Sequence, residues 1–82
     1  MNPFRKWRES RNLTRRDVAV LLGVSVSHVQ AVETGIVAHP YRSLLEAFTT
    51  VAGSSTADQL AHDYAVWRDT QRVATLAKIH EG

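Results

Sequence analysis

The chain has 82 residues, no cysteine and a formal net charge of +2. A chain of this length forms one small domain that buries only about 60 to 65% of its unfolded surface, and the lack of cysteine excludes disulfides, thiolate zinc sites and thiol catalysis. Because no apolar run approaches the roughly 18 residues of a membrane span and the first residues do not form a signal peptide, we expect a soluble, cytoplasmic protein.

Hydrophobic periodicity and capping residues predict an all-α fold of five helices. The first helix is expected at residues 3–11, with Asn12 as a left-handed exit. The second begins after Thr14, whose side chain forms a capping box with Asp17, and it ends near Leu22.

The third helix is capped by Ser25 and ends at Gly35. After a loop, a fourth helix carries an apolar stripe made of Leu44, Leu45, Phe48, Val51 and Ala52. A final helix is capped by Ser55 or Thr56 and reaches His80. At about 1.5 Å per residue, its roughly 25 residues span about 37 Å, which is long for a domain of this size.

The apolar band of this last helix is wider than a single surface helix needs. Either the whole band packs on the first four helices, or part of it contacts a second copy or another protein. We favour the second interpretation, because the core of so small a domain is limited. The residues expected at this dimer or partner surface are Leu60, Tyr64, Trp67, Val73 and Leu76. The chain is thus divided into an N-terminal core (residues 1–53) and a C-terminal helix (residues 54–82).

Residues 14–35 are typical of two short helices joined by one tight turn. Ala19 is the small residue that a close helix crossing needs, and Gly23 occupies the turn. Apolar residues at helical spacing supply a shared core: Val18, Leu22, Val24, Val29 and Val32. The segment therefore predicts a helix-turn-helix, a motif that places its second helix in the major groove of DNA.

Positive charge is concentrated in the part of the chain that contains this motif. Residues 1–50 have a net charge of +3, whereas residues 51–82 have a net charge of −1. This asymmetry is expected if the N-terminal part contacts phosphates. On charge alone, an ordinary solvated helical surface is an equally good interpretation.

The motif resembles the Cro/phage-repressor (xenobiotic-response-element type) helix-turn-helix family. The similarity covers residues 4–52 and rests on Leu13–Ala19, Leu22–Ser25, Val29 and Val32–Gly35. The resemblance implies a compact repressor-like domain, a small stand-alone transcriptional regulator that binds double-stranded DNA. It further implies an autoregulating repressor that binds an inverted repeat as a homodimer.

The resemblance also assigns site residues. The third helix becomes the recognition helix, and its base-contacting residues are Val26, Ser27, His28, Gln30 and Ala31. The residues expected at phosphates are Arg15, Arg16, Thr34, His39, Tyr41, Arg42 and Ser43. Basic residues flank the motif at Arg5, Lys6 and Arg11, and Arg8 and Glu33 match positions that commonly form a buried ion pair.

The recognition helix carries no Lys or Arg, so bidentate guanine recognition from this helix is not expected. Gln30 can form two hydrogen bonds with an adenine edge, Ser27 can donate to or accept from any base, and Val26 can contact a thymine methyl group. Specificity can also come from DNA shape or from the flanking basic residues.

Catalysis and protein interaction are the two alternatives to DNA binding. Catalysis is not expected, nor is a cofactor or a metal, because the four histidines lack the spacing of a metal motif and there is no Gly-rich phosphate loop. A protein-interaction module on the same scaffold, including an antitoxin or a phage or plasmid maintenance factor, remains the alternative. Salt discriminates between them, because affinity for DNA falls steeply as the salt concentration rises.

Overall fold

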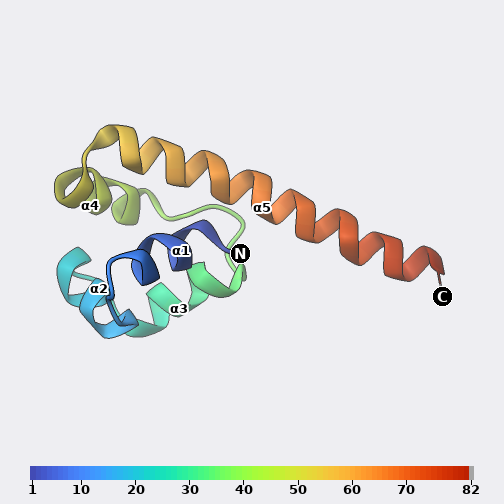
Figure 1. Ribbon diagram of the computed structural model, residues 1–82, viewed down its shortest axis with the longest axis horizontal. Coiled ribbons are helices and arrows are strands. Elements are labelled where there is room, and N and C mark those ends of the chain that lie inside the picture. The colour runs from blue at the N-terminus through green and yellow to red at the C-terminus, as the bar shows by residue number, and fades with distance from the viewer. Residues whose placement is uncertain (82) are drawn as a thin grey trace.

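The computed structural model describes residues 1–81 and contains five α-helices and no strand over that range. Their order is α1 (Pro3–Ser10), α2 (Arg15–Leu22), α3 (Val26–Thr34), α4 (Arg42–Ala52) and α5 (Ser54–Glu81). Figure 1 shows α1 to α4 and the first half of α5 gathered in a globular head, from which the second half of α5 projects. The expected all-α fold of five helices is confirmed. None of the helices within residues 1–81 has the length and apolar character that a membrane span requires.

Local capping interactions set the ends of α1 and α2. The Thr14 hydroxyl accepts a hydrogen bond from the Asp17 amide (3.0 Å), and the Asp17 carboxylate accepts one from the Thr14 amide (2.9 Å). The predicted capping box is therefore confirmed. Asn12 is left-handed with a φ of +55°, as expected, although α1 ends at Ser10, one residue earlier than the prediction.

A single residue, Gly53, separates α4 from α5. Its carbonyl accepts a hydrogen bond from the Ala57 amide (3.1 Å), so the chain turns and enters the new helix at once. The cap predicted at Ser55 or Thr56 is therefore wrong, because α5 already begins at Ser54. Its 28 residues make α5 longer than expected.

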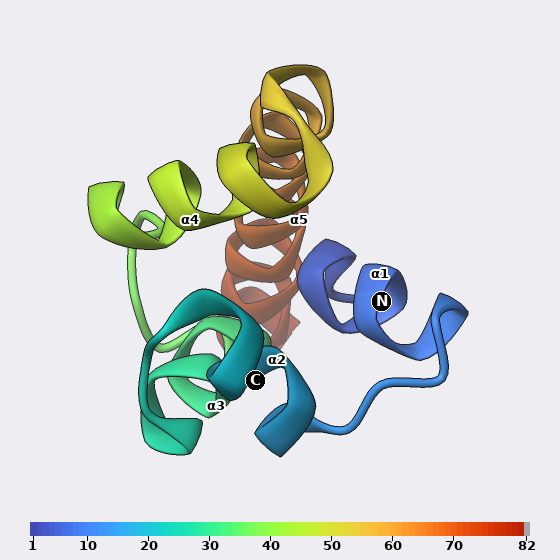
Figure 2. The same ribbon diagram turned by 90° about the vertical axis from the view of Figure 1, so that its left-hand side faces the viewer.

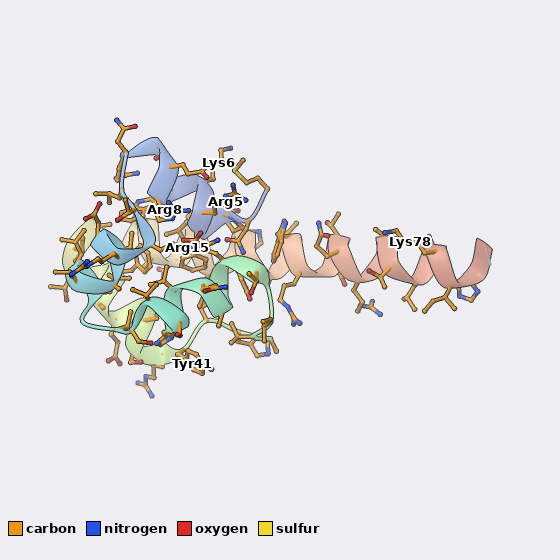
Figure 3. All side chains as sticks on the ribbon, turned by 90° about the horizontal axis from the view of Figure 1, so that it is seen from below. Arg5, Lys6, Arg8, Arg15, Tyr41 and Lys78 are labelled. Atoms are coloured by element: carbon orange, nitrogen blue, oxygen red, sulfur yellow. The ribbon has the colours of Figure 1, made fainter. Side chains whose placement is uncertain are left out.

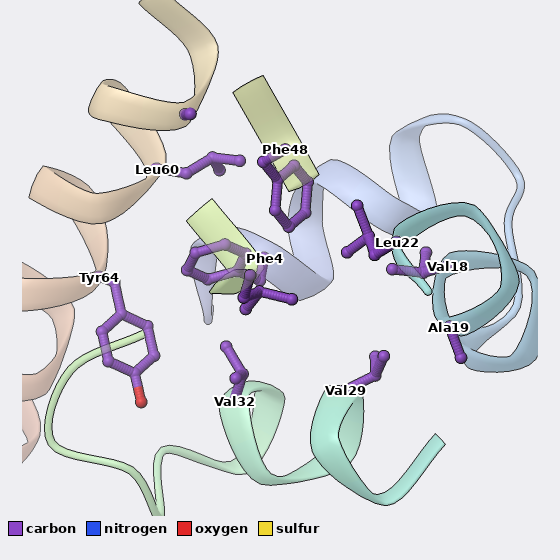
Figure 4. Packing of buried hydrophobic residues seen from close by; sticks show 11 residues of the cluster. Phe4, Val18, Ala19, Leu22, Val29, Val32, Phe48, Leu60 and Tyr64 are labelled. Atoms are coloured by element: carbon purple, nitrogen blue, oxygen red, sulfur yellow. The ribbon is translucent and has the colours of Figure 1, made fainter. Parts of the chain in front are cut away.

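All five helices contribute to one hydrophobic core (Figure 4). The ring of Phe4 lies 5.3 Å from that of Phe48 and 5.6 Å from that of Tyr64, measured between centroids. Such tilted and edge-on aromatic pairs contribute about 0.5–1.5 kcal/mol each beyond the burial of area. The buried hydrophobic residues are Phe4, Val18, Ala19, Leu22, Val29, Val32, Leu44, Phe48, Ala57, Leu60 and Tyr64.

Two residues assigned to a dimer or partner surface belong to this core instead. Leu60 is only 7% exposed and Tyr64 is completely buried, so neither can contact a second molecule, and that part of the prediction is wrong. Helical spacing identifies an apolar face, but it does not say which element covers the face. Trp67 is partly buried, and only Val73 and Leu76 of the predicted set are exposed.

The middle of α5 is fixed to the segment that follows α3. The Tyr64 hydroxyl donates a hydrogen bond to the Val37 carbonyl (2.6 Å), and Arg68 Nε donates one to the Gly35 carbonyl (3.1 Å). Burial raises the pKa of Tyr64, which keeps its hydroxyl protonated as a donor. The ring of Trp67 covers Gly35 so closely that a Cβ there would lie 2.7 Å from two ring carbons. The C-terminal end of α3 is therefore held by α5.

Gly35 and Gly23 offer a matched test of this contact. Both are left-handed, with φ of +79° and +67°, so alanine at either position costs about 1–2 kcal/mol in backbone strain. A Cβ at Gly23 would meet no atom within 4 Å, whereas one at Gly35 would displace Trp67. We expect Gly35→Ala to lower the free energy of unfolding by at least about 1 kcal/mol more than Gly23→Ala, because overpacking adds to strain. Equal losses in urea unfolding would contradict the close packing of Trp67 on Gly35.

Candidate nucleic-acid interface

The helices α2 and α3 form the two arms of the predicted helix-turn-helix. α2 ends at the left-handed Gly23, and α3 begins after Ser25, whose hydroxyl accepts a hydrogen bond from the His28 amide (3.0 Å). α3 ends at the left-handed Gly35, and all these ends agree with the sequence prediction. Their inner faces supply five buried residues, Val18, Ala19, Leu22, Val29 and Val32. Because this face of α3 is covered, the opposite face is the one that can contact a ligand.

The opposite face of α3 is exposed and carries no charge. Val26 is 43% exposed, and Ser27 and Gln30 are also exposed. Ala31 is partly buried, and its carbonyl accepts a hydrogen bond from the exposed Thr34 hydroxyl (3.3 Å). The side chains available to base edges are therefore Val26, Ser27 and Gln30.

His28 does not belong to this exposed face. Its ring packs edge-on against the ring of Tyr41, with centroids 4.5 Å apart and an interplanar angle of 84°. Its Nε2 atom is buried without a hydrogen-bond partner among the described residues, so in this packing that atom is not accessible to a base. The assignment of His28 to the bases stays a prediction. Tyr41, which is 50% exposed, covers the position instead. Within residues 1–81, no three His, Asp or Glu side chains are grouped so as to hold a metal ion.

The structure places Arg8 and Glu33 in an ion pair with two hydrogen bonds. Arg8 Nε donates to Glu33 Oε2 (2.8 Å) and Arg8 Nη2 to Oε1 (3.0 Å), while Nη1 donates to the Leu13 carbonyl (2.9 Å). The hydrogen bonds from Arg8 to Glu33 raise the pKa of Arg8, so the guanidinium stays charged. The Glu33 side chain is 2% exposed, which leaves the pair largely outside the screening of water.

A second arginine, Arg15, approaches the same carboxylate. Its Nε donates to Glu33 Oε1 (3.3 Å), and its side chain remains 37% exposed. Glu33 thus joins α1, α2 and α3 through two guanidinium groups. No sequence spacing predicts this second contact, because Arg15 and Glu33 are 18 positions apart and lie on different helices.

Basic side chains lie beside the recognition helix. In Figure 3, which views the molecule towards α3, Arg5, Lys6, Arg8 and Arg15 lie on one side of this helix and Tyr41 lies on the other. If α3 lay in a DNA groove, the two sugar-phosphate backbones that border the groove would lie near these two flanks.

Besides Arg15, three arginines assigned to DNA have local contacts. Arg5 and Arg42 pair with the glutamates four residues later, at 2.8 and 3.3 Å, and the guanidinium of Arg11 lies 4.5 Å from the ring centroid of Trp7. Exposed ion pairs of this kind contribute only about 0–1 kcal/mol, so a phosphate can compete for the arginines. The other residues assigned to phosphates or to the flanks are exposed: Lys6, Arg16, Thr34, His39 and Ser43.

Sequence analysis missed one residue that positions the recognition helix. Asn2 is buried, and its side-chain oxygen accepts hydrogen bonds from the Phe4 amide (2.9 Å) and the Arg5 amide (3.2 Å). Its side-chain nitrogen donates to the Val32 carbonyl in α3 (2.9 Å). An asparagine directly before a proline signals the helix cap. Nothing local signals the bond to Val32.

The fold and this geometry define a small all-α protein with a helix-turn-helix. Residues 4–62 match a family model described as a helix-turn-helix domain, and the chain belongs to that family. No curated protein and no solved structure matches the chain.

The cluster around Glu33 predicts unequal effects for its two arginines. Arg8→Ala leaves a buried carboxylate with one partly exposed partner, so we expect it to lower the free energy of unfolding by about 3 kcal/mol. Arg15→Ala removes the longer and more exposed contact and should cost less than about 1 kcal/mol. Urea unfolding measures both, with Arg5→Ala as the control for an exposed pair. Equal losses for Arg8→Ala and Arg5→Ala would contradict a structural role for the buried pair.

Proposed function

We propose that this protein binds double-stranded DNA sequence-specifically through the exposed face of α3. The observation that carries the proposal is an uncharged, solvent-exposed helix face on a helix-turn-helix, with basic side chains along one flank (Figure 3). Membership of the helix-turn-helix domain family supports DNA as the partner. In such interfaces phosphate contacts orient the protein and base contacts specify the sequence.

Three side chains on α3 supply the proposed base contacts. Gln30 donates to and accepts from an adenine edge, and Ser27 donates to or accepts from a neighbouring base. Val26, at the start of α3, contacts a thymine methyl group. This set favours a site in which A·T pairs occupy the positions under α3.

Phosphate contacts come from both flanks of α3. On α2, Arg15 donates its Nε hydrogen to Glu33, which leaves both Nη groups of Arg15 able to donate to a phosphate. The next residue, Arg16, is exposed. On the other flank, Tyr41 and Ser43 are exposed at the start of α4. Because the bases are contacted by neutral side chains, the charge-dependent part of the affinity comes from these flanks.

We further propose that the protein is a cytoplasmic, non-enzymatic regulator of the Cro/phage-repressor type, acting as an autoregulating repressor. In this proposal a homodimer binds an inverted repeat, with one recognition helix in each of two major grooves. The half-site centres then lie about 34 Å apart, one turn of DNA. The resemblance of residues 4–52 supports the type, and the small core of each chain supports the dimer.

A protein-interaction module is the second candidate, because the exposed face of α3 carries no charge and residues 69–80 of α5 are exposed. In that case the helix-turn-helix would serve only as a scaffold. Such a module would bind its partner without the salt dependence of a phosphate interface.

The test is the affinity for a duplex from the region upstream of its own gene, measured by fluorescence anisotropy as salt rises. Contact with about four phosphates lowers the affinity roughly 100-fold between 50 and 200 mM salt. We expect Arg15→Ala to reduce the slope of log K against log salt by about 1. Lys78→Ala removes the same charge from the projecting end of α5, far from α3, and should leave the slope unchanged (Figure 3). No binding at low salt, or equal slopes for the two variants, would favour the interaction module.

A further inference from the structure

Between Asp69 and His80, α5 projects beyond the head and forms no hydrogen bond with it. Arg68 makes the last hydrogen bond to the head, through the Gly35 carbonyl, and every residue from 69 to 80 is exposed. A helical stretch of this length has marginal stability in water without tertiary contacts. Contacts with a second molecule would supply the missing stabilisation.

Exposed apolar side chains follow one side of this projecting helix. Val66 and Val73 are each 53% exposed, Leu76 is 41% exposed and Ile79 is 68% exposed. They are seven, three and three residues apart, so they form a stripe that winds gradually along one side of the helix. Large apolar side chains arranged in this way mark an interaction surface rather than a solvated one.

A groove lies beside this row, between α5 and the C-terminal end of α3. It has a volume of about 620 Å³, and its lining includes Gly35, His39, Trp67, Arg68 and Leu76. The groove thus borders both the projecting helix and the cap of the recognition helix. A segment seated in it would contact the element that presents α3 to DNA.

We propose that the projecting half of α5 packs antiparallel against the same segment of a second copy, with the two-fold axis between Arg72 and Val73. This inference rests on the proposed dimeric DNA binding and identifies the dimer interface, here called the seam. In this register Val66 lies opposite the partner's Ile79, and Leu76 lies opposite the partner's Asp69. The last turn of the partner's α5 then lies beside the groove at Trp67.

Charge favours the antiparallel arrangement. Two parallel helices in register would place Asp69 beside the partner's Asp69 and Arg72 beside the partner's Arg72, and such like-charge pairs are unfavourable. In the antiparallel register Asp69 lies about one helical turn from the partner's Arg72, within reach of its long side chain. Because the same row serves both copies, the interface is self-complementary, as a two-fold dimer requires.

The length of α5 fits the spacing of DNA grooves. At about 1.5 Å per residue, this axis places the two Tyr64 residues about 26 Å apart and the two Leu60 residues about 38 Å apart. These core residues belong to the heads, so their separations bracket the roughly 34 Å between adjacent major grooves on one face of DNA. Figure 1 shows α5 projecting beyond the head, which leaves room for a second head.

The contact area that the projecting part of α5 alone can supply is small. From Val66 onward the helix is about 24 Å long, which places the helix pair near the lower end of the area that specific dimers bury. Contacts in the groove add to this area. We therefore expect a dimer with a dissociation constant in the micromolar range.

Cysteine cross-linking tests the register, because the chain has no native cysteine. An equimolar mixture of Val66→Cys and Ile79→Cys should form a covalent heterodimer under mild oxidation. Each variant alone should not, because identical cysteines would lie about 20 Å apart. Self-cross-linking of each variant would reveal a parallel pair and overturn the proposal. Ala74→Cys, on the opposite side of α5, is the control that should remain monomeric with either variant.

Sedimentation without DNA tests the seam independently of DNA binding. We expect twice the 9.2 kDa mass for the wild type, at least a tenfold weaker dimer for Leu76→Glu and no change for the matched control Ala74→Glu. Both residues are exposed, so circular dichroism should show intact heads. A monomeric wild type, or a Leu76→Glu variant that stays dimeric, would overturn the seam. A wild-type protein that dimerises but does not bind DNA would instead overturn the proposed function.

Discussion

The arrangement of the head depends on one buried carboxylate. Glu33 lies near the end of α3, is nearly inaccessible to water and binds guanidinium groups from α1 and α2. Removing one partner of such a group leaves charge in a low-dielectric interior, so α3 cannot rotate without a large penalty. Two residues further on, Gly35 is held by Trp67 and Arg68 of α5. The recognition helix is therefore fixed at its C-terminal end by neighbours on three helices. Its face that carries Val26, Ser27 and Gln30 stays exposed.

This arrangement separates orientation from recognition. Charged side chains lie on the flanks of α3, whereas the exposed face of α3 itself presents short or neutral side chains. In the proposed complex the flanks supply the salt-dependent affinity and Ser27 and Gln30 supply the discrimination between bases. The proposed seam on α5 adds a third element, because the groove at Trp67 borders the residue that ends α3. Occupation of that groove would restrict the end of the recognition helix, so dimerisation and DNA binding are expected to reinforce one another.

What the sequence could predict was local. The capping box of Thr14 and Asp17, the cap at Ser25 and the left-handed Gly35 all follow from interactions within a few residues, and the structure contains each of them. Contacts between distant segments left no comparable signal. The burial of Leu60 and Tyr64 depends on which helix covers them, and helical periodicity carries no such information.

The same limit applies to the candidate site. A family resemblance could assign His28 to the bases, but only the three-dimensional packing shows its ring under Tyr41. The bond from Arg15 to Glu33 likewise joins separate helices. The assignments of Ser27 and Gln30 to base edges stay predictions, since their exposure allows DNA contact without requiring it.

In the proposed complex, two α3 helices enter adjacent major grooves on one face of a duplex. A hydroxyl-radical footprint on the DNA upstream of its own gene tests it most directly. We expect two related protected segments whose centres lie about one helical turn apart, on the same face, within an inverted repeat. A single protected segment, or two whose spacing places them on opposite faces, would contradict it.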